Sequence, residues 1–213
     1  MKSVKWFATT GVLLTSSLLL VACGGSNSKN TSTYSYVYTS DPTTLDYTVS
    51  NRAVDSDVAG NLVDGLMETD KYGNLVPSLA EDWTVSKDGL TYTYKLRKDA
   101  KWYTSEGEEY AEVKAEDFVT GLKHAVDAKS EALYLVQNSV KGLDAYVKGE
   151  DKDFSHVGIK ALDDHTIQYT LAKPESFWNS KTTMGILFPI NAEFLKSQGK
   201  NFGAPKTSGI VAD

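Results

Sequence analysis

The chain has 213 residues, 41% of them hydrophobic and 23% charged, and its formal net charge at pH 7 is −6. Such an acidic chain lacks the basic face that nucleic acids require, so we expect no nucleic acid among its partners. Cys23 is the only cysteine, which excludes an internal disulfide and a multi-cysteine metal site, and leaves an ordinary hydrophobic core in one domain or two.

The first 25 residues have the order of a secretory signal peptide: two lysines, an apolar stretch from about residue 6 to residue 21, and Leu-Val-Ala-Cys ending at Cys23. These last four residues resemble the lipobox of bacterial lipoproteins. The resemblance implies that residues 1–22 are a lipoprotein signal peptide and that Cys23 is lipidated. The alternative is a transmembrane helix, but serines and threonines interrupt an apolar run that would need about 20 residues.

Residues 23–32 are polar and read as a flexible tether. The alternating stretch Thr33–Tyr38 places three tyrosines on one face and predicts a strand, with the tyrosines packing in a core. A helix is predicted over Asp55–Leu66, because apolar residues recur every four positions. Asp55 or Ser56 can cap its first turn.

Two hairpins are predicted further along the chain. The first, Asp82–Leu96, alternates on both sides of a turn that contains Asp-Gly, a dipeptide that tolerates positive φ angles. The second, Val157–Leu171, turns at Asp163-Asp164-His165. Helices are expected at Ala115–Asp127, within Glu131–Val147, and from an Asn191 cap to just before Gly199.

Enzymatic signals are weak throughout the sequence. There is no HExxH, GxSxG, P-loop, GxGxxG or EF-hand pattern. The histidines, His124, His156 and His165, are expected to be solvated or locally hydrogen-bonded. We therefore expect no catalytic residues, no metal, no cofactor and no enzymatic activity.

The stretch from Asn74 to Phe118 reads NLVPSLAEDWTVSKDGLTYTYKLRKDAKWYTSEGEEYAEVKAEDF. It resembles the signature region of the extracellular solute-binding proteins of peptide ABC transporters, with the order P-x-L-A-x-x-W, D-G-L-x-Y-x-Y-x-L-R, K-W and A-x-D-F. The resemblance extends over about Tyr36–Phe194. There are departures: Tyr47 stands where the family usually has proline, which leaves that turn less fixed, and Lys114 stands where threonine often caps the helix.

The resemblance implies an α/β fold with a mixed sheet, β-hairpins and packed helices. Residues 33–213 would be an incomplete first lobe of a two-lobed periplasmic-binding-protein-like fold (type II, cluster C). About residues 50–180 would form an inserted subdomain, and the second lobe would be absent from these 213 residues. The expected core is Trp83, Tyr92, Tyr94, Leu96, Phe118, Leu122, Ile167 and Leu171.

For function, the resemblance implies the lipid-anchored substrate-binding component of an oligopeptide ABC importer, on the extracellular face of the cell membrane. Its partners would be oligopeptides in the full-length form, the transporter's permease subunits, and the membrane through the lipid. The spacing from Leu45-Asp46 to Gly65-Leu66 matches the family's, which points to Ser50, Asn51, Arg52 and Ala53 as the ligand-facing segment. The plain alternative for these four residues is an exposed loop.

Residues 1–213 alone are not expected to bind peptide with useful affinity, because one wall of the cleft would be missing. A different reading is a single-lobe surface lipoprotein that acts in adhesion or sensing, which would need an exposed apolar patch. A third is an anchored hydrolase, for which the sequence shows no motif.

Overall fold

The computed structural model describes residues 37–204 and 210–212, and the part from Tyr38 onward forms one compact unit. The predicted signal peptide, Cys23 and the tether lie outside the described residues. So does most of the strand predicted at Thr33–Tyr38; its last two residues, Val37 and Tyr38, are exposed and not in a strand.

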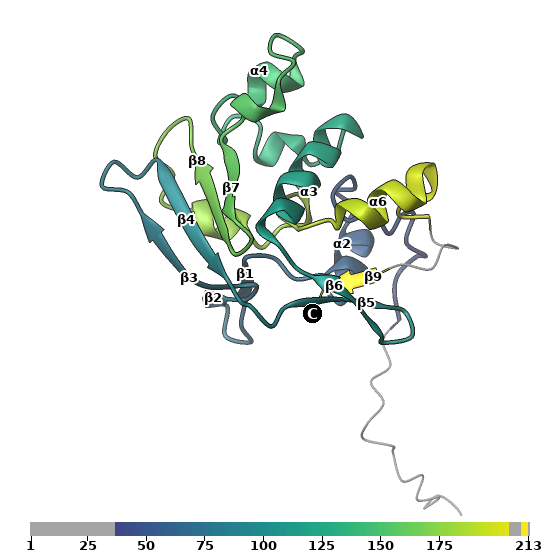
Figure 1. The fold of residues 1–213 in the computed structure, drawn as a ribbon. Helices are drawn as coiled ribbons and strands as arrows, with labels where there is room; N and C mark the ends of the chain where they lie inside the picture. The colour runs from purple at the N-terminus through teal and green to yellow at the C-terminus, as the bar shows by residue number, and fades with distance from the viewer. Residues whose placement is uncertain (1–36, 205–209, 213) are drawn as a thin grey trace, which may run out of the picture. The chain divides into compact units, whose positions relative to one another are not determined.

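The elements follow one another along the chain as Figure 1 shows. The helices and strands are α2 (Ala53–Ala59), β1 (Met67–Thr69), β2 (Leu75–Pro77), β3 (Ala80–Val85), β4 (Thr91–Leu96), β5 (Lys101–Thr104), β6 (Glu109–Glu112), α3 (Ala115–Asp127), α4 (Leu143–Val147), β7 (Ile159–Asp163), β8 (Thr166–Thr170), α5 (Trp178–Lys181), α6 (Ala192–Gln198) and β9 (Ile210–Ala212). Short 3₁₀ helices lie at Leu133–Leu135, Phe154–His156, Gly185–Leu187 and Gly199–Asn201.

The central sheet has the order β3-β4-β8-β7 and is built from the two predicted hairpins, which are confirmed. Tyr94 lies opposite Trp83 on one side and Ile167 on the other. A mixed sheet was expected, but every ladder between described residues is antiparallel. The reason is that tight turns reverse the chain within each hairpin, and the two hairpins then meet through β4 and β8, which also run in opposite directions.

One face of this sheet is buried because large apolar side chains alternate with polar ones along β4 and β8. α3 packs against β7 and β8 (Figure 1). The predicted core is confirmed except that Trp83 is only half-buried, on an edge strand. The predicted residues that are buried are Tyr92, Tyr94, Leu96, Phe118, Leu122, Ile167 and Leu171.

Two smaller sheets complete the strand pairing: β1 with β2, and the three strands β6-β5-β9. β9 pairs with β5 over Trp102–Thr104. α3 begins at Ala115 and ends at Asp127, as predicted. No threonine caps it; instead the Asp117 carboxylate accepts the backbone N–H of Lys114 at 3.0 Å.

The helix predicted over Asp55–Leu66 is shorter than expected. α2 covers only Ala53–Ala59, and its N-cap is Arg52, without a side-chain bond. Gly60 ends it, since glycine is a poor helix former, and the chain then turns so that Val63 and Leu66 reach the core while Leu62 stays 37% exposed.

A helix was also expected within Glu131–Val147, and α4 lies there, although it has only five residues and follows a 3₁₀ turn. Gly142 separates them with φ 74°, a left-handed conformation that interrupts a helix. The last predicted helix is confirmed as α6, in which the Asn191 side chain accepts the N–H of Phe194 at 2.9 Å.

Candidate functional site

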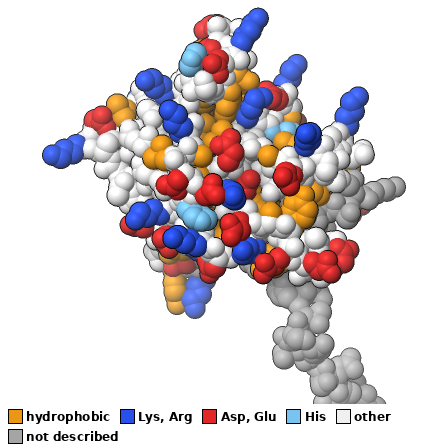
Figure 2. Space-filling model, viewed as in Figure 1, with side chains coloured by type: hydrophobic (Ala, Val, Ile, Leu, Met, Phe, Trp, Pro, Cys, Tyr) orange, Lys and Arg blue, Asp and Glu red, His pale blue; other side chains and the backbone are white. Residues whose placement is uncertain are grey.

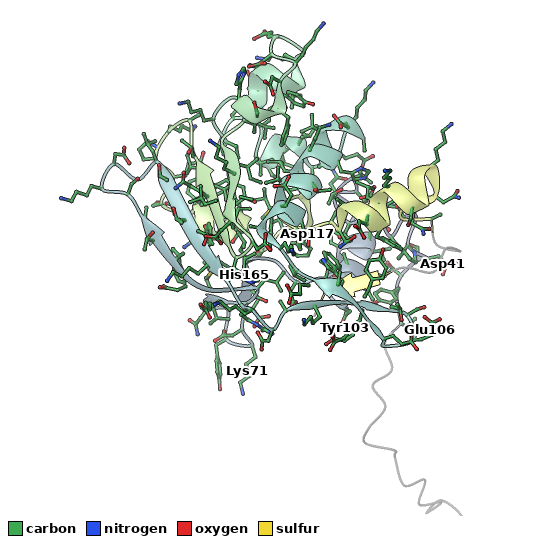
Figure 3. The ribbon with its side chains drawn as sticks, viewed as in Figure 1. Asp41, Lys71, Tyr103, Glu106, Asp117 and His165 are labelled. Atoms are coloured by element: carbon green, nitrogen blue, oxygen red, sulfur yellow. The ribbon has the colours of Figure 1, made fainter. Side chains whose placement is uncertain are left out.

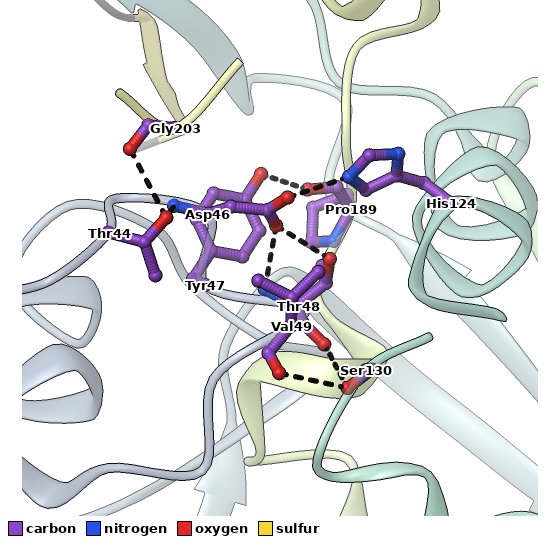
Figure 4. A network of polar contacts seen from close by, with 9 residues as sticks. All are labelled: Thr44, Asp46, Tyr47, Thr48, Val49, His124, Ser130, Pro189 and Gly203. Atoms are coloured by element: carbon purple, nitrogen blue, oxygen red, sulfur yellow. Dashed lines mark hydrogen bonds and ion pairs between the residues drawn. The ribbon is translucent and has the colours of Figure 1, made fainter. Parts of the chain in front are cut away.

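The predicted ligand-facing residues lie in the segment Thr43–Asp55, which is a loop as far as Arg52 and then enters the first turn of α2. Asn51, Arg52 and Ala53 are exposed, and Ser50 is half-buried. The residues before them, Thr44–Val49, which we call the strap, are held by distant parts of the chain (Figure 4). The exposed residues 51–53 therefore follow a segment whose position is fixed by hydrogen bonds.

The C-terminal part of the described chain holds the start of the strap. The carbonyl oxygen of Gly203 accepts the N–H of Leu45 at 2.7 Å and the hydroxyl of Thr44 at 3.2 Å. The Tyr47 hydroxyl donates to the carbonyl oxygen of Pro189 at 2.6 Å. Burial, with lesser contributions from Asp46 and Asp117, raises the pKa of Tyr47 well above its ordinary value, so the hydroxyl keeps its proton. Tyr47 thus fixes a turn that was expected to be less fixed without proline.

α3 holds the middle of the strap through an acid–histidine pair. Nε2 of His124 lies 2.7 Å from Oδ2 of Asp46, with side-chain exposures of 19% and 9%. The other oxygen of Asp46 accepts the hydroxyl of Thr48 at 2.8 Å and its N–H at 3.2 Å. The His124 ring also meets Phe202 edge-on. A solvated or locally bonded His124 was expected; the structure instead pairs it with a residue 78 positions away.

The segment after α3 holds the end of the strap. The Ser130 hydroxyl donates to the carbonyl oxygen of Thr48 at 2.6 Å, and the N–H of Glu131 donates to that of Val49 at 2.8 Å. Thr48 is fully buried. The backbone N–H of Thr48 is therefore bonded to Asp46 and its carbonyl oxygen to Ser130 (Figure 4).

Asp55 closes the loop at its other end. Its carboxylate accepts the N–H and the hydroxyl of Thr43, both at 2.8 Å, and the hydroxyl of Ser50 at 2.6 Å. Burial alone would raise the pKa of Asp55, but these hydrogen bonds favour the ionised form and lower the pKa below its ordinary value. The expectation that Asp55 caps α2 is wrong; it lies in the first turn and ties Thr43 to Ser50.

Between these fixed ends, residues 50–53 present their backbone. The N–H of Arg52 donates to the Ser50 hydroxyl at 3.2 Å. Within the described part of the chain, the N–H groups of Asn51 and Ala53 have no hydrogen-bond partner. Exposed donors on a held loop can pair with the carbonyl oxygens of an extended ligand.

Close backbone approaches lock the strap further, and they require glycine. A Cβ on Gly185 would lie 2.4 Å from the carbonyl oxygen of Tyr47. A Cβ on Gly203, whose φ is 72°, would lie 2.4 Å from Asp46. A side chain at either position would push the strap away.

A second polar cluster, which the sequence did not reveal, lies under α5. Nζ of Lys181 is 2.9 Å from Oε2 of Glu175 and 2.6 Å from Oγ of Ser139, whose hydroxyl donates to Oε1 of Glu175 at 2.9 Å. The Glu175 and Lys181 side chains are only 5% and 16% exposed. The cluster joins the Ser139 segment to α5 in the interior.

Other kinds of site were sought in residues 37–204 and 210–212. No group of three or more His, Cys, Asp or Glu side chains there could hold a metal ion. No helix in the same residues is long and apolar enough to cross a bilayer. Figure 2 shows cationic and anionic side chains interspersed over one face, without a field of one sign.

Comparison with known proteins gives consistent matches. Residues 74–210 match the family described as bacterial extracellular solute-binding proteins, family 5 Middle. The oligopeptide-binding protein AliA of Streptococcus pneumoniae is 67% identical over 204 residues, which are 95% of this chain and 31% of AliA. SarA of Streptococcus gordonii, also named an oligopeptide-binding protein, is 64% identical over 210 residues, 95% of this chain and 32% of SarA.

Among solved structures, the chain resembles Listeria monocytogenes OppA bound to peptide, with a TM-score of 0.74 and 30% identity over 82% of this chain and 33% of that one. The chain thus spans about a third of the length of the relatives it matches. The α/β fold expected from the sequence is confirmed by this likeness.

Proposed function

The chain belongs to the bacterial extracellular solute-binding proteins of family 5, and from this premise we propose that it is the lipid-anchored peptide-binding component of an ABC importer. In this role it binds oligopeptides at the extracellular face of the cell membrane, delivers them to permease subunits, and catalyses no reaction. The proposal includes a signal peptide at residues 1–22, a tether at 23–32, and part of a first lobe from residue 33, with about residues 50–180 inserted as a subdomain.

The observation that carries the proposal is a loop held at both ends, in which the backbone N–H groups of Asn51 and Ala53 have no hydrogen-bond partner among the described residues. A transporter of mixed peptides needs affinity that does not depend on sequence. Main-chain hydrogen bonds to an extended peptide supply it, because every peptide offers the same carbonyl oxygens.

Ala53→Pro tests this pairing with little disturbance of the fold. Ala53 is the first residue of α2, a position that tolerates proline, and Arg52 before it is already extended, with φ −79° and ψ 135°. The substitution removes one N–H, so we expect peptide affinity to fall about 3- to 10-fold, the worth of one hydrogen bond.

The measurement is calorimetry on a chimaera in which residues 37–212 replace the matching segment of AliA. Ala192→Pro is the matched control, because Ala192 is the first residue of α6 and follows an extended Asn191. Equal affinities for parent, Ala53→Pro and Ala192→Pro would remove residues 50–53 from the site.

We further propose that residues 24–213 alone bind peptide poorly, because they carry one wall of the cleft. A peptide on a one-sided groove stays half solvated and cannot offset the ordering cost of association. Calorimetry with a mixed peptide library is expected to give no binding at micromolar concentrations. Micromolar binding by a monomeric, folded chain would make this part a binding module by itself.

The lipid anchor is tested by Cys23→Ala. Each buried CH₂ contributes about 0.8 kcal/mol, so two or more acyl chains attach a protein stably and their loss releases it. The variant is expected in the soluble fraction after cell fractionation, while the tether variant Ser26→Ala stays with the membrane as the parent does. Membrane retention of the Cys23→Ala variant would refute the anchor.

A further inference from the structure

We propose that His124, acting through Asp46, is the positioning residue that sets the peptide-facing segment 50–53, so that peptide affinity depends on a pair that touches no peptide. The inference rests on the proposed function for its ligand. The structural part of the inference, that His124 controls the conformation of the strap, rests only on the contacts in the structure.

Thr48 lies two residues before Ser50. The peptide groups before and after Thr48 are both hydrogen-bonded: Asp46 accepts the N–H and hydroxyl of Thr48, and Ser130 donates to its carbonyl oxygen at 2.6 Å. Val49 follows directly and accepts from the N–H of Glu131. The direction in which the chain leaves toward Ser50 is therefore set at Thr48.

The hydrogen bonds from Thr48 to Asp46 require that the Asp46 carboxylate be oriented correctly. One of its oxygens bonds Thr48 and the other bonds Nε2 of His124 at 2.7 Å (Figure 4). Without the His124 donor, Oδ2 of a mostly buried carboxylate loses its partner, and the group gains by rotating toward water. That rotation takes Oδ1 away from Thr48.

The remaining contacts confine this change to the end of the strap and the residues that follow it. The hydrogen bonds of Thr44 and Leu45 to Gly203, and of Tyr47 to Pro189, do not include His124, whose ring contacts Phe202 beside Gly203. The core around β4 and β8 makes no use of the pair. Loss of the donor therefore loosens residues 48–53 while the sheet stays intact.

The experiment compares three variants of the 213-residue chain by amide hydrogen exchange. His124→Ala removes the donor, and His124→Gln keeps an N–H donor on a side chain of similar reach. His156→Ala is the matched control, because His156 also pairs with an aspartate, Asp151, at 2.8 Å, but its side chain lies at the surface and is 64% exposed.

We expect His124→Ala to speed exchange at the Thr48 and Glu131 amides at least about tenfold, with the β4 amides unchanged. His124→Gln should restore most of the protection, and His156→Ala should have no effect at these amides. Unchanged exchange in His124→Ala, or equal loosening in all amides of the chain, would overturn the inference.

The peptide half is decided in the AliA chimaera. We expect His124→Ala to weaken peptide binding about tenfold, His124→Gln to bind nearly as the parent does, and His156→Ala to bind equally. Loosened amides with unchanged affinity would overturn the peptide half of the inference and leave the proposed function standing. A parent chimaera that binds no peptide would instead refute the proposed function, and the exchange data would still decide the structural half.

Discussion

Lys181→Met is expected to lower the free energy of unfolding by about 3–5 kcal/mol. The substitution keeps the length of the side chain but leaves the Glu175 carboxylate, 5% exposed, without its cation at 2.9 Å. Leaving one buried charge without its counter-ion destabilises the fold more than the intact pair stabilises it, because neither water nor another cation replaces Lys181. Ser139 still donates to the other oxygen and cannot neutralise the charge.

The measurement is urea denaturation of the AliA chimaera and its variants. Lys148→Met is the matched control, since Lys148 pairs with Asp144 at 2.6 Å on the surface, where such pairs contribute about 0–1 kcal/mol. The double variant Glu175→Gln/Lys181→Met should be more stable than Lys181→Met alone, because no charge is then buried. A Lys181→Met loss no larger than that of Lys148→Met would contradict the prediction.

Asp117 is expected to make stability fall as pH rises from about 4 to about 6. Asp117 lies in the first turn of α3 (Figure 3), where burial raises its pKa from 3.8 to about 6, against the opposing hydrogen bonds from Lys114 and Trp102. In that interval the unfolded chain releases the proton while the folded chain keeps it. The folded state is therefore favoured below the unfolded pKa, and this advantage, about 3 kcal/mol, is lost as pH rises through the folded pKa.

Asp117→Asn isolates this contribution. Its amide oxygen can still accept the N–H groups of Trp102 and Lys114, but it does not titrate. Unfolding free energies measured from pH 4 to 7 should show the parent losing about 3 kcal/mol relative to this variant. Glu193→Gln, an exposed acid in the first turn of α6, is the control, and parallel curves for parent and Asp117→Asn would refute the assignment.

The elements that the sequence predicted well are those specified by neighbouring residues. The Asp88-Gly89 turn and the alternation of apolar and polar residues on both sides of it indicate β3 and β4 without reference to the rest of the chain. α3 is marked by an apolar stripe and by acids in its first turn.

Prediction was weaker where a short apolar pattern was compatible with two different local structures. The spacing of Val58, Leu62 and Leu66 fits a helix face, but it also fits a short helix followed by a turn that brings Val63 and Leu66 to the core. Only tertiary packing distinguishes the two. Gly142 likewise gave no sign that it takes a left-handed conformation.

The candidate site shows the same division. The position of residues 50–53 came from a resemblance in spacing, and their exposure agrees with either a ligand-facing segment or a plain loop. Their supports could not be predicted, because His124, Ser130 and Gly203 are far away in sequence and are common residue types. Lys181 and Glu175 were hidden for a related reason: in sequence, a buried ion pair looks like surface charge.

The strap also has a consequence for the order in which the protein takes shape during synthesis. Thr44 and Gly203 are 159 positions apart, so the ribosome must release nearly the whole described chain before they can meet. The hairpins and α3 close over short sequence distances and can fold earlier, whereas long-range pairing waits on a slow chain closure. The segment proposed to meet the peptide is therefore among the first described residues to be made and among the last to reach its final position.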